Sequence, residues 1–429
     1  MPHALFSRLK KPQLIVFILL CLWLIFVVFS VNRLLADLQA KNDRDLPFGI
    51  LSSNGIVSAQ DFAYNMLYFK GIRERLVPNP YRFEDQEQMI RQLLPSMTSG
   101  RTHAYSPVGF VLALPLLTFS GRDMYLIYTI LSALGFALLY YSYLLPRAEH
   151  PLQLAALAIC ALSVWFVTTF AVGQSSVLTT TLIGALWCLL KRRPAASSIW
   201  IDISIAMLFW MVCLKPSVAI IPFMLLLGVR AWRPLVLGMA MLLITWISVA
   251  KYYGGWWTGF WDYLYLLNHY HDAGFTPFLR TVNEAALDKD QALMLFSVKR
   301  DLLLFSSLAL LILRLIRRIT GSDHFQGMVW AFLLFSPYLM PSENLILCLL
   351  VVEGSFFCSD NRLLVYGKLL LLIGILDLRT DVTLIEGNDF QLKCLLFAWV
   401  SAEWLHARWK GLAIPDHEEE RHPVTHPSP

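Results

Sequence analysis

One carboxylate near the start of the chain combines a useful residue type with an informative position. Asp61 stands directly before an amphipathic run, Phe62–Ile72, in which Tyr64, Tyr68 and Phe69 are interleaved. An aspartate at the start of a helix caps backbone N–H groups and suits the helix dipole. Held near a membrane surface, the same carboxylate can act as a general base that takes a proton from an acceptor hydroxyl. The residue type alone leaves both roles open.

One lysine is the cation with the most unusual position. Lys215 closes a long apolar run and is followed by Pro216. A lysine at the centre of a membrane span costs roughly 2.5–3.5 kcal/mol, so such ionisable groups tend to have a partner or a function. Its ammonium can meet a phosphate on which charge develops. Alternatively, its stem can extend so that the charge reaches the membrane interface.

Further polar residues lie near these two. Gln174 stands in a short turn between apolar runs, where it can bind a sugar hydroxyl or serve only as a polar turn residue. Arg101 and His103 precede the run Ser106–Phe119, and Arg122 follows it. These three side chains can contact a phosphate or an acceptor, or have a structural role.

Two histidines occur in an aromatic stretch further along the chain. His269 and His271 are two residues apart, so they do not share a helical face. A metal site needs several converging ligands with support behind them. We therefore expect these histidines to bind a sugar or an acceptor, and we expect no metal or cofactor. The seven cysteines lie in or beside apolar runs, and no C-x-x-C motif occurs. We therefore interpret them as small buried apolar residues, with neither a disulfide framework nor a metal site.

The composition places these residues in a membrane protein. The 429 residues are 57% hydrophobic and 15% charged, with a mean hydropathy of +0.57, whereas soluble domains carry about 25% charged residues. Lysine and arginine occur in short clusters between apolar runs, which is typical of membrane topology and gives no continuous basic face for nucleic acid.

The apolar runs predict an all-α polytopic fold with about twelve transmembrane helices. The first run follows Arg8, Lys10 and Lys11 and exceeds the roughly 7–15 apolar residues of a secretory signal, so we expect a retained anchor. The twelve predicted spans are Gln13–Leu35, 123–145, 152–172, 176–191, 199–215, 217–231, 234–251, 301–316, 326–342, 343–359, 363–379 and 390–407.

Basic connections stay on the cytoplasmic side, and this rule orients the spans. It places both termini in the cytoplasm and indicates a bacterial inner membrane. The assignment requires that the run Ser106–Phe119 does not cross; with about 14 residues it is short for a span, and we expect a helix that lies along the outer membrane surface or dips back into it. The cytoplasmic connections are then Pro146–Pro151, Lys191–Arg193, Arg230–Arg233, Arg314–Arg318, Asn361–Arg362 and Arg408–Lys410.

The predicted organisation is a single polytopic domain over residues 1–410. Two long segments lie outside the membrane: residues 36–105 with juxtamembrane helices, and residues 252–300, which are rich in aromatics suited to the headgroup interface. Residues 411–429 are polar and proline-rich, which predicts a disordered cytoplasmic tail.

An ordered series of short motifs over roughly residues 55–345 resembles glycosyltransferase family 87, which has the GT-C architecture. The motifs are Asp61-Phe62 with Tyr64, Gly71 and Pro80-Tyr81, then Tyr105-Ser106-Pro107, Pro115-Leu116-Leu117, Gly173–Ser176, Leu214-Lys215-Pro216, Arg230–Arg233 and Ser336-Pro337.

The resemblance implies a transferase that moves a mannose, another hexose or a pentose from a polyprenyl-phosphate donor to a glycan or lipid acceptor on the outer face. It implies that Asp61 is the base and favours Lys215 as the phosphate-binding cation, with Arg122 and Arg101 as further candidates. Because a polyprenyl phosphate is an acidic leaving group, it departs without a general acid, so one carboxylate is enough, whereas glycoside hydrolases use two. A single displacement would invert the configuration at the anomeric carbon. The remaining candidates, for binding sugar or acceptor, are Tyr64, Tyr81, His103, Tyr105, Gln174, His269, His271 and Glu343.

Glu343 marks a departure from the family pattern, because a histidine or aromatic is expected at that outer turn. Two other function classes remain open. A transporter or flippase would use ionisable groups inside spans, and Asp202 and Glu353 are of this kind. A polymerase-like component of envelope polysaccharide assembly would lengthen a lipid-linked glycan by repeat units, whereas the family adds single sugars.

Overall fold

The described structure consists of helices joined by turns and short irregular segments. The computed structural model describes residues 9–41, 60–93, 105–148, 150–163, 166–167, 169–170, 173–193, 198–269, 289–337, 341–353, 362–376 and 389–409. Within these ranges no strand occurs, so the predicted all-α class is confirmed. The proposed tail, residues 411–429, lies outside them.

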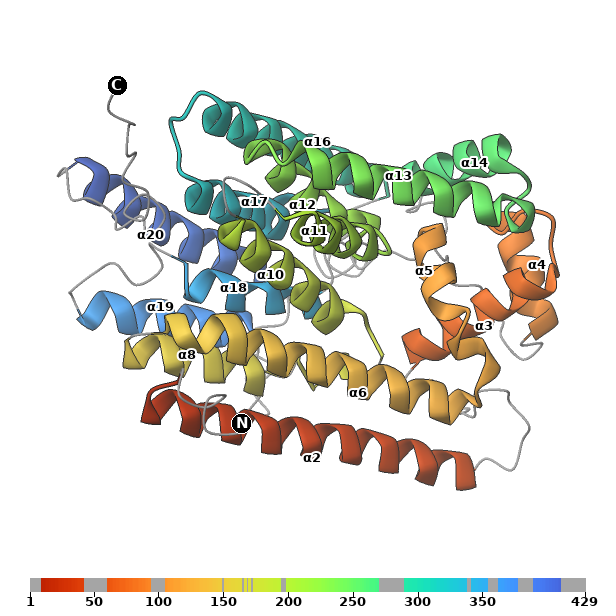
Figure 1. The fold of residues 1–429 in the computed structure, drawn as a ribbon, viewed down its shortest axis with the longest axis horizontal. Helices are drawn as coiled ribbons and strands as arrows, with labels where there is room; N and C mark the ends of the chain where they lie inside the picture. The colour runs from red at the N-terminus through yellow and green to blue at the C-terminus, as the bar shows by residue number, and fades with distance from the viewer. Residues whose placement is uncertain are drawn as a thin grey trace.

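Most of the longer helices run along the long axis of the molecule and form a bundle (Figure 1). The bundle contains α2 (Lys11–Lys41), α6 (Gly121–Leu139), α8 (Pro151–Leu162), α10 (Ser176–Arg192), α11 (Ile199–Val212), α12 (Pro216–Gly228), α13 (Trp232–Val249), α16 (Lys289–Leu315), α17 (Gly321–Phe335), the short α18 (Leu347–Val351), α19 (Arg362–Ile375) and α20 (Asp389–Trp409).

Four further helices gather at one end of the bundle, on the right in Figure 1. They are α3 (Gln60–Glu74), α4 (Phe83–Leu93), α5 (Pro107–Ala113) and α14 (Trp256–Asn268). We call this the aromatic end. The basic end is the opposite one, and it carries the turns that hold Lys191–Arg193, Arg230–Arg233 and Arg314–Arg318.

Three helical segments of the described residues are long and apolar enough to cross a membrane: Lys11–Arg33, Asp123–Arg147 and Trp232–Tyr252. They identify a membrane protein. Each of the other nine predicted runs overlaps a helix, but in several the helix covers only part of the run: α8 ends at Leu162 within 152–172, and α18 holds five residues of 343–359. α11 has 14 residues, or about 21 Å of helix, against about 30 Å of hydrocarbon. The number of crossings therefore stays a prediction.

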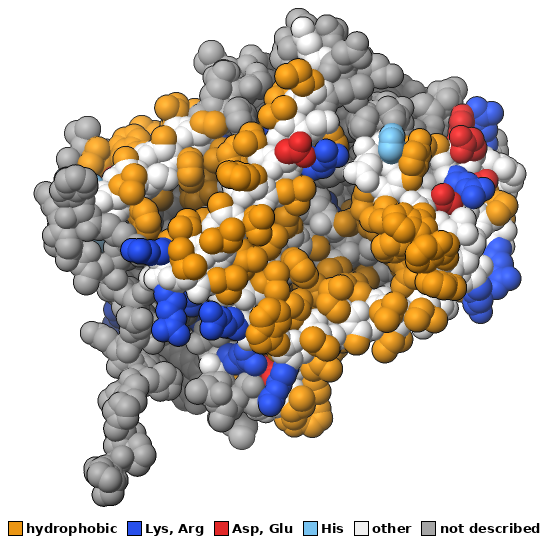
Figure 2. Space-filling view, turned by 90° about the horizontal axis from the view of Figure 1, so that it is seen from above, with side chains coloured by type: hydrophobic (Ala, Val, Ile, Leu, Met, Phe, Trp, Pro, Cys, Tyr) orange, Lys and Arg blue, Asp and Glu red, His pale blue; other side chains and the backbone are white. Residues whose placement is uncertain are grey.

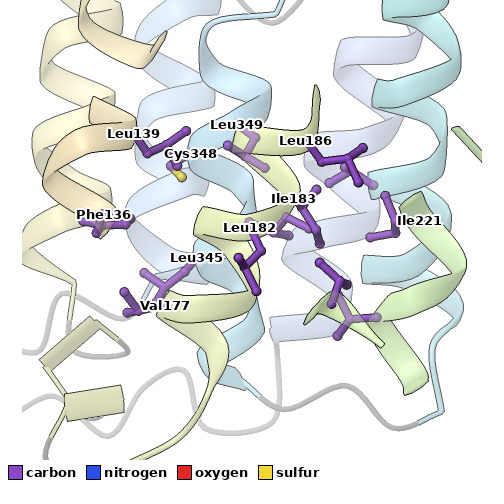
Figure 3. Packing of buried hydrophobic residues seen from close by; sticks show 14 of the residues in the cluster. Phe136, Leu139, Val177, Leu182, Ile183, Leu186, Ile221, Leu345, Cys348 and Leu349 are labelled. Atoms are coloured by element: carbon purple, nitrogen blue, oxygen red, sulfur yellow. The ribbon is translucent and has the colours of Figure 1, made fainter. Parts of the chain in front are cut away.

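The bundle closes around α10, which is buried along most of its length. Figure 3 shows Leu182, Ile183 and Leu186 of α10 among side chains from α6, α12 and α18. Gly184 allows this close approach, because a Cβ there would lie 2.7 Å from Leu139 Cδ1 and 2.8 Å from Leu349 Cδ2. Small residues have this role widely between membrane helices.

The run Ser106–Phe119 folds as the seven-residue helix α5 and a single 3-10 turn, Leu116–Thr118. Seven residues span about 10 Å, so this helix is too short to cross. α5 runs across the bundle axis (Figure 1). Its buried residues include Val108 and Phe110, and it packs against α3 and α13. The helix is thus part of the packed aromatic end.

Candidate functional site

Lys215 lies at the aromatic end, in the turn between α11 and α12. It is the N-cap residue of α12, and Pro216 takes the first helical position, where its missing N–H is not needed. The Lys215 side chain keeps 16% of its surface exposed. Lys215 is thus held at a helix start, and its side chain is not fully buried.

The Lys215 ammonium forms an ion pair with the Glu343 carboxylate. Glu343 belongs to the 3-10 helix Pro341–Ile346, and only 3% of its side chain is exposed. A carboxylate buried this deeply needs a compensating charge. The pair therefore joins the start of α12 to the turn that leads into α18, and two predicted site residues contact each other directly.

Ser106 fixes the start of α5 beside this pair. Its hydroxyl donates to Cys213 O at 2.6 Å, and its backbone N–H donates to Leu214 O at 3.2 Å. These two carbonyls belong to the last turn of α11, directly before Lys215. Two motifs of the ordered series, Tyr105-Ser106-Pro107 and Leu214-Lys215-Pro216, are therefore in direct contact.

Tyr105 continues the chain of contacts in two directions. Its hydroxyl lies 3.4 Å from Ser175 Oγ, in the turn that precedes α10. Its carbonyl accepts a hydrogen bond of 3.1 Å from the Tyr81 hydroxyl. Tyr105 therefore lies between the polar turn at Gln174 and the segment that follows α3.

Gly173 brings the start of α3 onto that same turn. Gly173 has φ +78°, and a Cβ there would lie 2.4 Å from Phe62 Cβ. The Phe62 ring packs against Tyr125 and Tyr128, with centroids 5.1 and 5.0 Å apart. Asp61 precedes Phe62 in the first turn of α3, as expected for a helix-start aspartate. The backbone of the predicted base thus lies beside the turn of Gln174, although its side chain lies outside the described residues.

Gln174 is part of this contact region through its backbone. Its carbonyl accepts a hydrogen bond of 2.6 Å from the hydroxyl of Tyr128 on α6. This bond fixes the backbone of the turn against α6. The predicted contact of the Gln174 side chain with a sugar stays a prediction.

Tyr81 lies in an aromatic cluster that supports the site. Its ring centroid is 4.8 Å from that of Tyr253 and 4.7 Å from that of Tyr263, and only 1% of its surface is exposed. Burial, with a smaller contribution from Tyr253, raises the pKa of the Tyr81 phenol well above its usual value, so the hydroxyl remains a donor. Tyr81 thus offers no face to a ligand in this structure and acts in packing.

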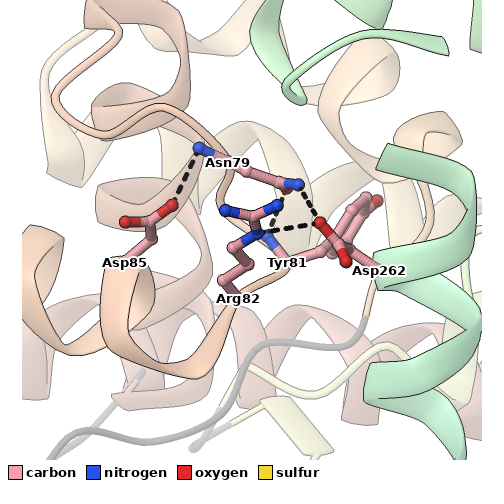
Figure 4. A network of polar contacts seen from close by, with 5 residues as sticks. All are labelled: Asn79, Tyr81, Arg82, Asp85 and Asp262. Carbon is pink, nitrogen blue, oxygen red and sulfur yellow. Dashed lines mark hydrogen bonds and ion pairs between the residues drawn. The ribbon is translucent and has the colours of Figure 1, made fainter. Parts of the chain in front are cut away.

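A polar network joins the same segment to α14 (Figure 4). Asp262 accepts hydrogen bonds from Asn79 Nδ2 at 2.5 Å and from Arg82 Nε at 3.0 Å. The backbone N–H of Asn79 donates to Asp85 Oδ2 at 3.0 Å. The two outer segments predicted from the sequence are therefore held together by one shared carboxylate. Neither Asn79 nor Asp262 stood out in the sequence, because nothing in it relates the two segments.

The other predicted residues are only partly placed. His269 ends α14, where its ring stacks on Tyr265 at 4.0 Å and Nδ1 lies 2.9 Å from Tyr265 O. Tyr64 lies on α3 and Arg122 on α6, and the side chains of both lie outside the described residues. The predicted residues that lie wholly outside the described ranges are Arg101, His103 and His271.

Glu353, which suggested a transporter, forms part of a polar cluster at the basic end. Its carboxylate accepts hydrogen bonds of 2.6 Å from both Lys191 Nζ and Ser322 Oγ, and another from the Tyr143 hydroxyl. Asp202 is likewise paired, with Arg193 Nε at 3.1 Å. The ion pairs and hydrogen bonds of both carboxylates join the ends of different helices. A structural role therefore explains why these two charges are buried.

Comparisons with protein-family models, with curated proteins and with solved structures find no match to this chain.

Proposed function

We propose that the protein is a membrane glycosyltransferase that moves a sugar from a polyprenyl-phosphate donor to a glycan or lipid acceptor. One observation carries the proposal. A series of contacts between neighbouring segments joins the start of α3, which holds Asp61, to the turn of Gln174, then to Tyr105 and Ser106, and finally to the last turn of α11, directly before Lys215. A base, a sugar-binding turn and a phosphate-binding cation would thus belong to one end of the molecule.

The proposed reaction needs few groups. Asp61 deprotonates the acceptor hydroxyl as it attacks the anomeric carbon, and the polyprenyl phosphate leaves with inversion at that carbon. Lys215 meets the charge that develops on the leaving phosphate. Glu343 fixes the ammonium in place, and the Lys215 side chain is less deeply buried than its partner, with 16% of its surface exposed against 3%.

The orientation in the membrane is part of the proposal. We infer that the basic end faces the cytoplasm, because arginine and lysine clusters are retained on that side. The aromatic end then faces the outside of a bacterial inner membrane, with both termini in the cytoplasm and about twelve crossings.

The test is transfer of a labelled sugar by the purified protein in lipid vesicles. The donors are polyprenyl-phosphate mannose and its hexose and pentose analogues, with membrane glycolipids and glycans as acceptors. Asp61→Asn is expected to abolish transfer, because the amide cannot take the proton. Asp123→Asn is the matched control, since Asp123 also lies in the first turn of a helix at this end, with Ser120 as its N-cap, and lies outside the proposed machinery.

Two readouts keep the test decisive. Thermal unfolding of both variants must match the wild type within the roughly 0.3–1 kcal/mol that a helix-start charge contributes. A folded Asp61→Asn protein that transfers sugar at the wild-type rate would remove the assigned base. Extension of a lipid-linked glycan by whole repeat units would assign the chain to the polymerase class.

A further inference from the structure

α14 exposes an aromatic face that a water-facing helix would not carry. Trp256, Trp257, Trp261 and Tyr265 each keep between 51% and 60% of their surface exposed. The opposite face of α14 is buried against the protein. The only charged residue of this helix, Asp262, lies toward that second face and is bound by Asn79 and Arg82. The exposed face therefore consists of large amphipathic rings without a charge.

The position of α14 follows from the turn before it. Gly254 and Gly255 have φ +73° and +105°, which reverses the chain after α13. Trp246 Nε1 then donates to Trp256 O at 2.7 Å. Trp246 lies six residues before the end of the candidate span Trp232–Tyr252, or about 9 Å along the helix. The start of α14 is thus level with a part of α13 that belongs to the span.

The exposed surface of α13 continues into that of α14. Leu243, Ile244 and Ile247 of α13 are all more than half exposed, as a surface in contact with lipid chains would be. In Figure 2, which views the molecule from above Figure 1, hydrophobic side chains cover the middle of the face and charged ones lie mostly toward its edges. The face holds α16, α13 and α14 (Figure 1).

We propose that the exposed face of α14 lies in the boundary between headgroups and acyl chains of the leaflet that surrounds the end of α13. Tryptophan and tyrosine favour this boundary because each ring has an apolar body and a polar N–H or O–H. An apolar face of this kind on a soluble surface marks an interaction site. Its continuity with the exposed apolar surface of α13 identifies lipid as the occupant.

Insertion of α14 has a consequence for the rest of the aromatic end. Tyr263 and Asp262, on the face away from lipid, hold Tyr81 and Arg82. The segment that joins α3 and α4 is thereby fixed at a set height above the membrane. The inference does not depend on the proposed enzymatic activity.

Depth-dependent fluorescence quenching tests this placement in the full-length protein. The wild type and the triple variant Trp256→Phe/Trp257→Phe/Trp261→Phe are reconstituted in phosphatidylcholine vesicles whose chains are brominated either near the headgroup or near the chain end. The emission lost in the triple variant reports the three α14 rings. Trp187→Phe is the control, because Trp187 is 1% exposed and stacks on Phe325 inside the bundle.

Bromines near the headgroup are expected to quench most of the α14 emission, bromines near the chain end much less, and aqueous iodide very little. The Trp187 emission should respond weakly to all three quenchers. Strong quenching by iodide without quenching by lipid would place the face in water. Emission that no quencher reaches would place it against protein, such as a second copy of the chain. Either result overturns the assignment to lipid.

Discussion

The ion pair between Lys215 and Glu343 allows a test that needs no substrate. We consider Lys215→Met, Glu343→Leu and the double variant. Each single change removes one side of this ion pair, whereas the double change replaces both charges by apolar side chains. The structure predicts unequal costs for the two single changes, because 3% of the Glu343 side chain and 16% of the Lys215 side chain are exposed.

The burial of each partner sets the size of the effect. Removing one member of a buried pair costs about 3–5 kcal/mol, and removing both is often neutral. Lys215→Met leaves a carboxylate with almost no access to water, so we expect a loss of about 3 kcal/mol. Glu343→Leu leaves a cation whose side chain is less deeply buried, so we expect about 2 kcal/mol. The double variant should lie within about 1 kcal/mol of the wild type.

The assay is thermal or denaturant-induced unfolding of all four proteins in the same lipid nanodiscs. The double-mutant cycle cancels effects that each side chain has on its other neighbours, so the coupling energy reports the pair. We expect the order wild type, double variant, Glu343→Leu, Lys215→Met, from most to least stable. Strictly additive losses would show that the two groups do not interact, and would refute the ion pair between Lys215 and Glu343.

Three further changes have expected outcomes that the same unfolding measurement checks. Gly173→Ala should cost about 3 kcal/mol, from the left-handed backbone and the clash with Phe62 Cβ; an unchanged stability would refute the close approach of α3. Tyr81→Phe should cost about 1 kcal/mol for one lost hydrogen bond, and a loss several times larger would indicate further roles of the hydroxyl. Glu353→Gln should cost about 2 kcal/mol because the Lys191 ammonium loses its counter-charge. The folded variant should still transfer sugar at the wild-type rate. Loss of activity without loss of stability would show that Glu353 has a functional role.

The helices were predictable from the sequence because apolar runs of the required length have few other stable arrangements in a membrane protein. Each predicted span overlaps a helix at least in part, and the run Ser106–Phe119 holds a seven-residue helix, which is too short to span. The exact lengths were less predictable. Pro216 and Gly228, for example, confine α12 to 13 residues, and sequence hydropathy extended that span to residue 231.

The site was predictable in its residue types and only partly in its contacts. Lys215 stood out because a cation beside a long apolar run is costly, but its partner Glu343 was assigned to a separate acceptor contact. Sequence does not show which distant segments meet. Tyr81 illustrates another limit, since an aromatic ring that can stack on a sugar can equally stack on Tyr253 and Tyr263, as it does here. Glu353 had no visible partner in the sequence because its donors come from three other helical segments.

A density map by electron cryomicroscopy of the protein in nanodiscs with a bound polyprenyl phosphate tests the proposed site most directly. The account predicts a phosphate within about 3 Å of Lys215 Nζ, in a cavity at the aromatic end that the Asp61 carboxylate also lines. A phosphate bound elsewhere, or an Asp61 carboxylate that bonds only to the N–H groups of its own helix and points away from the lipid phosphate, would contradict it.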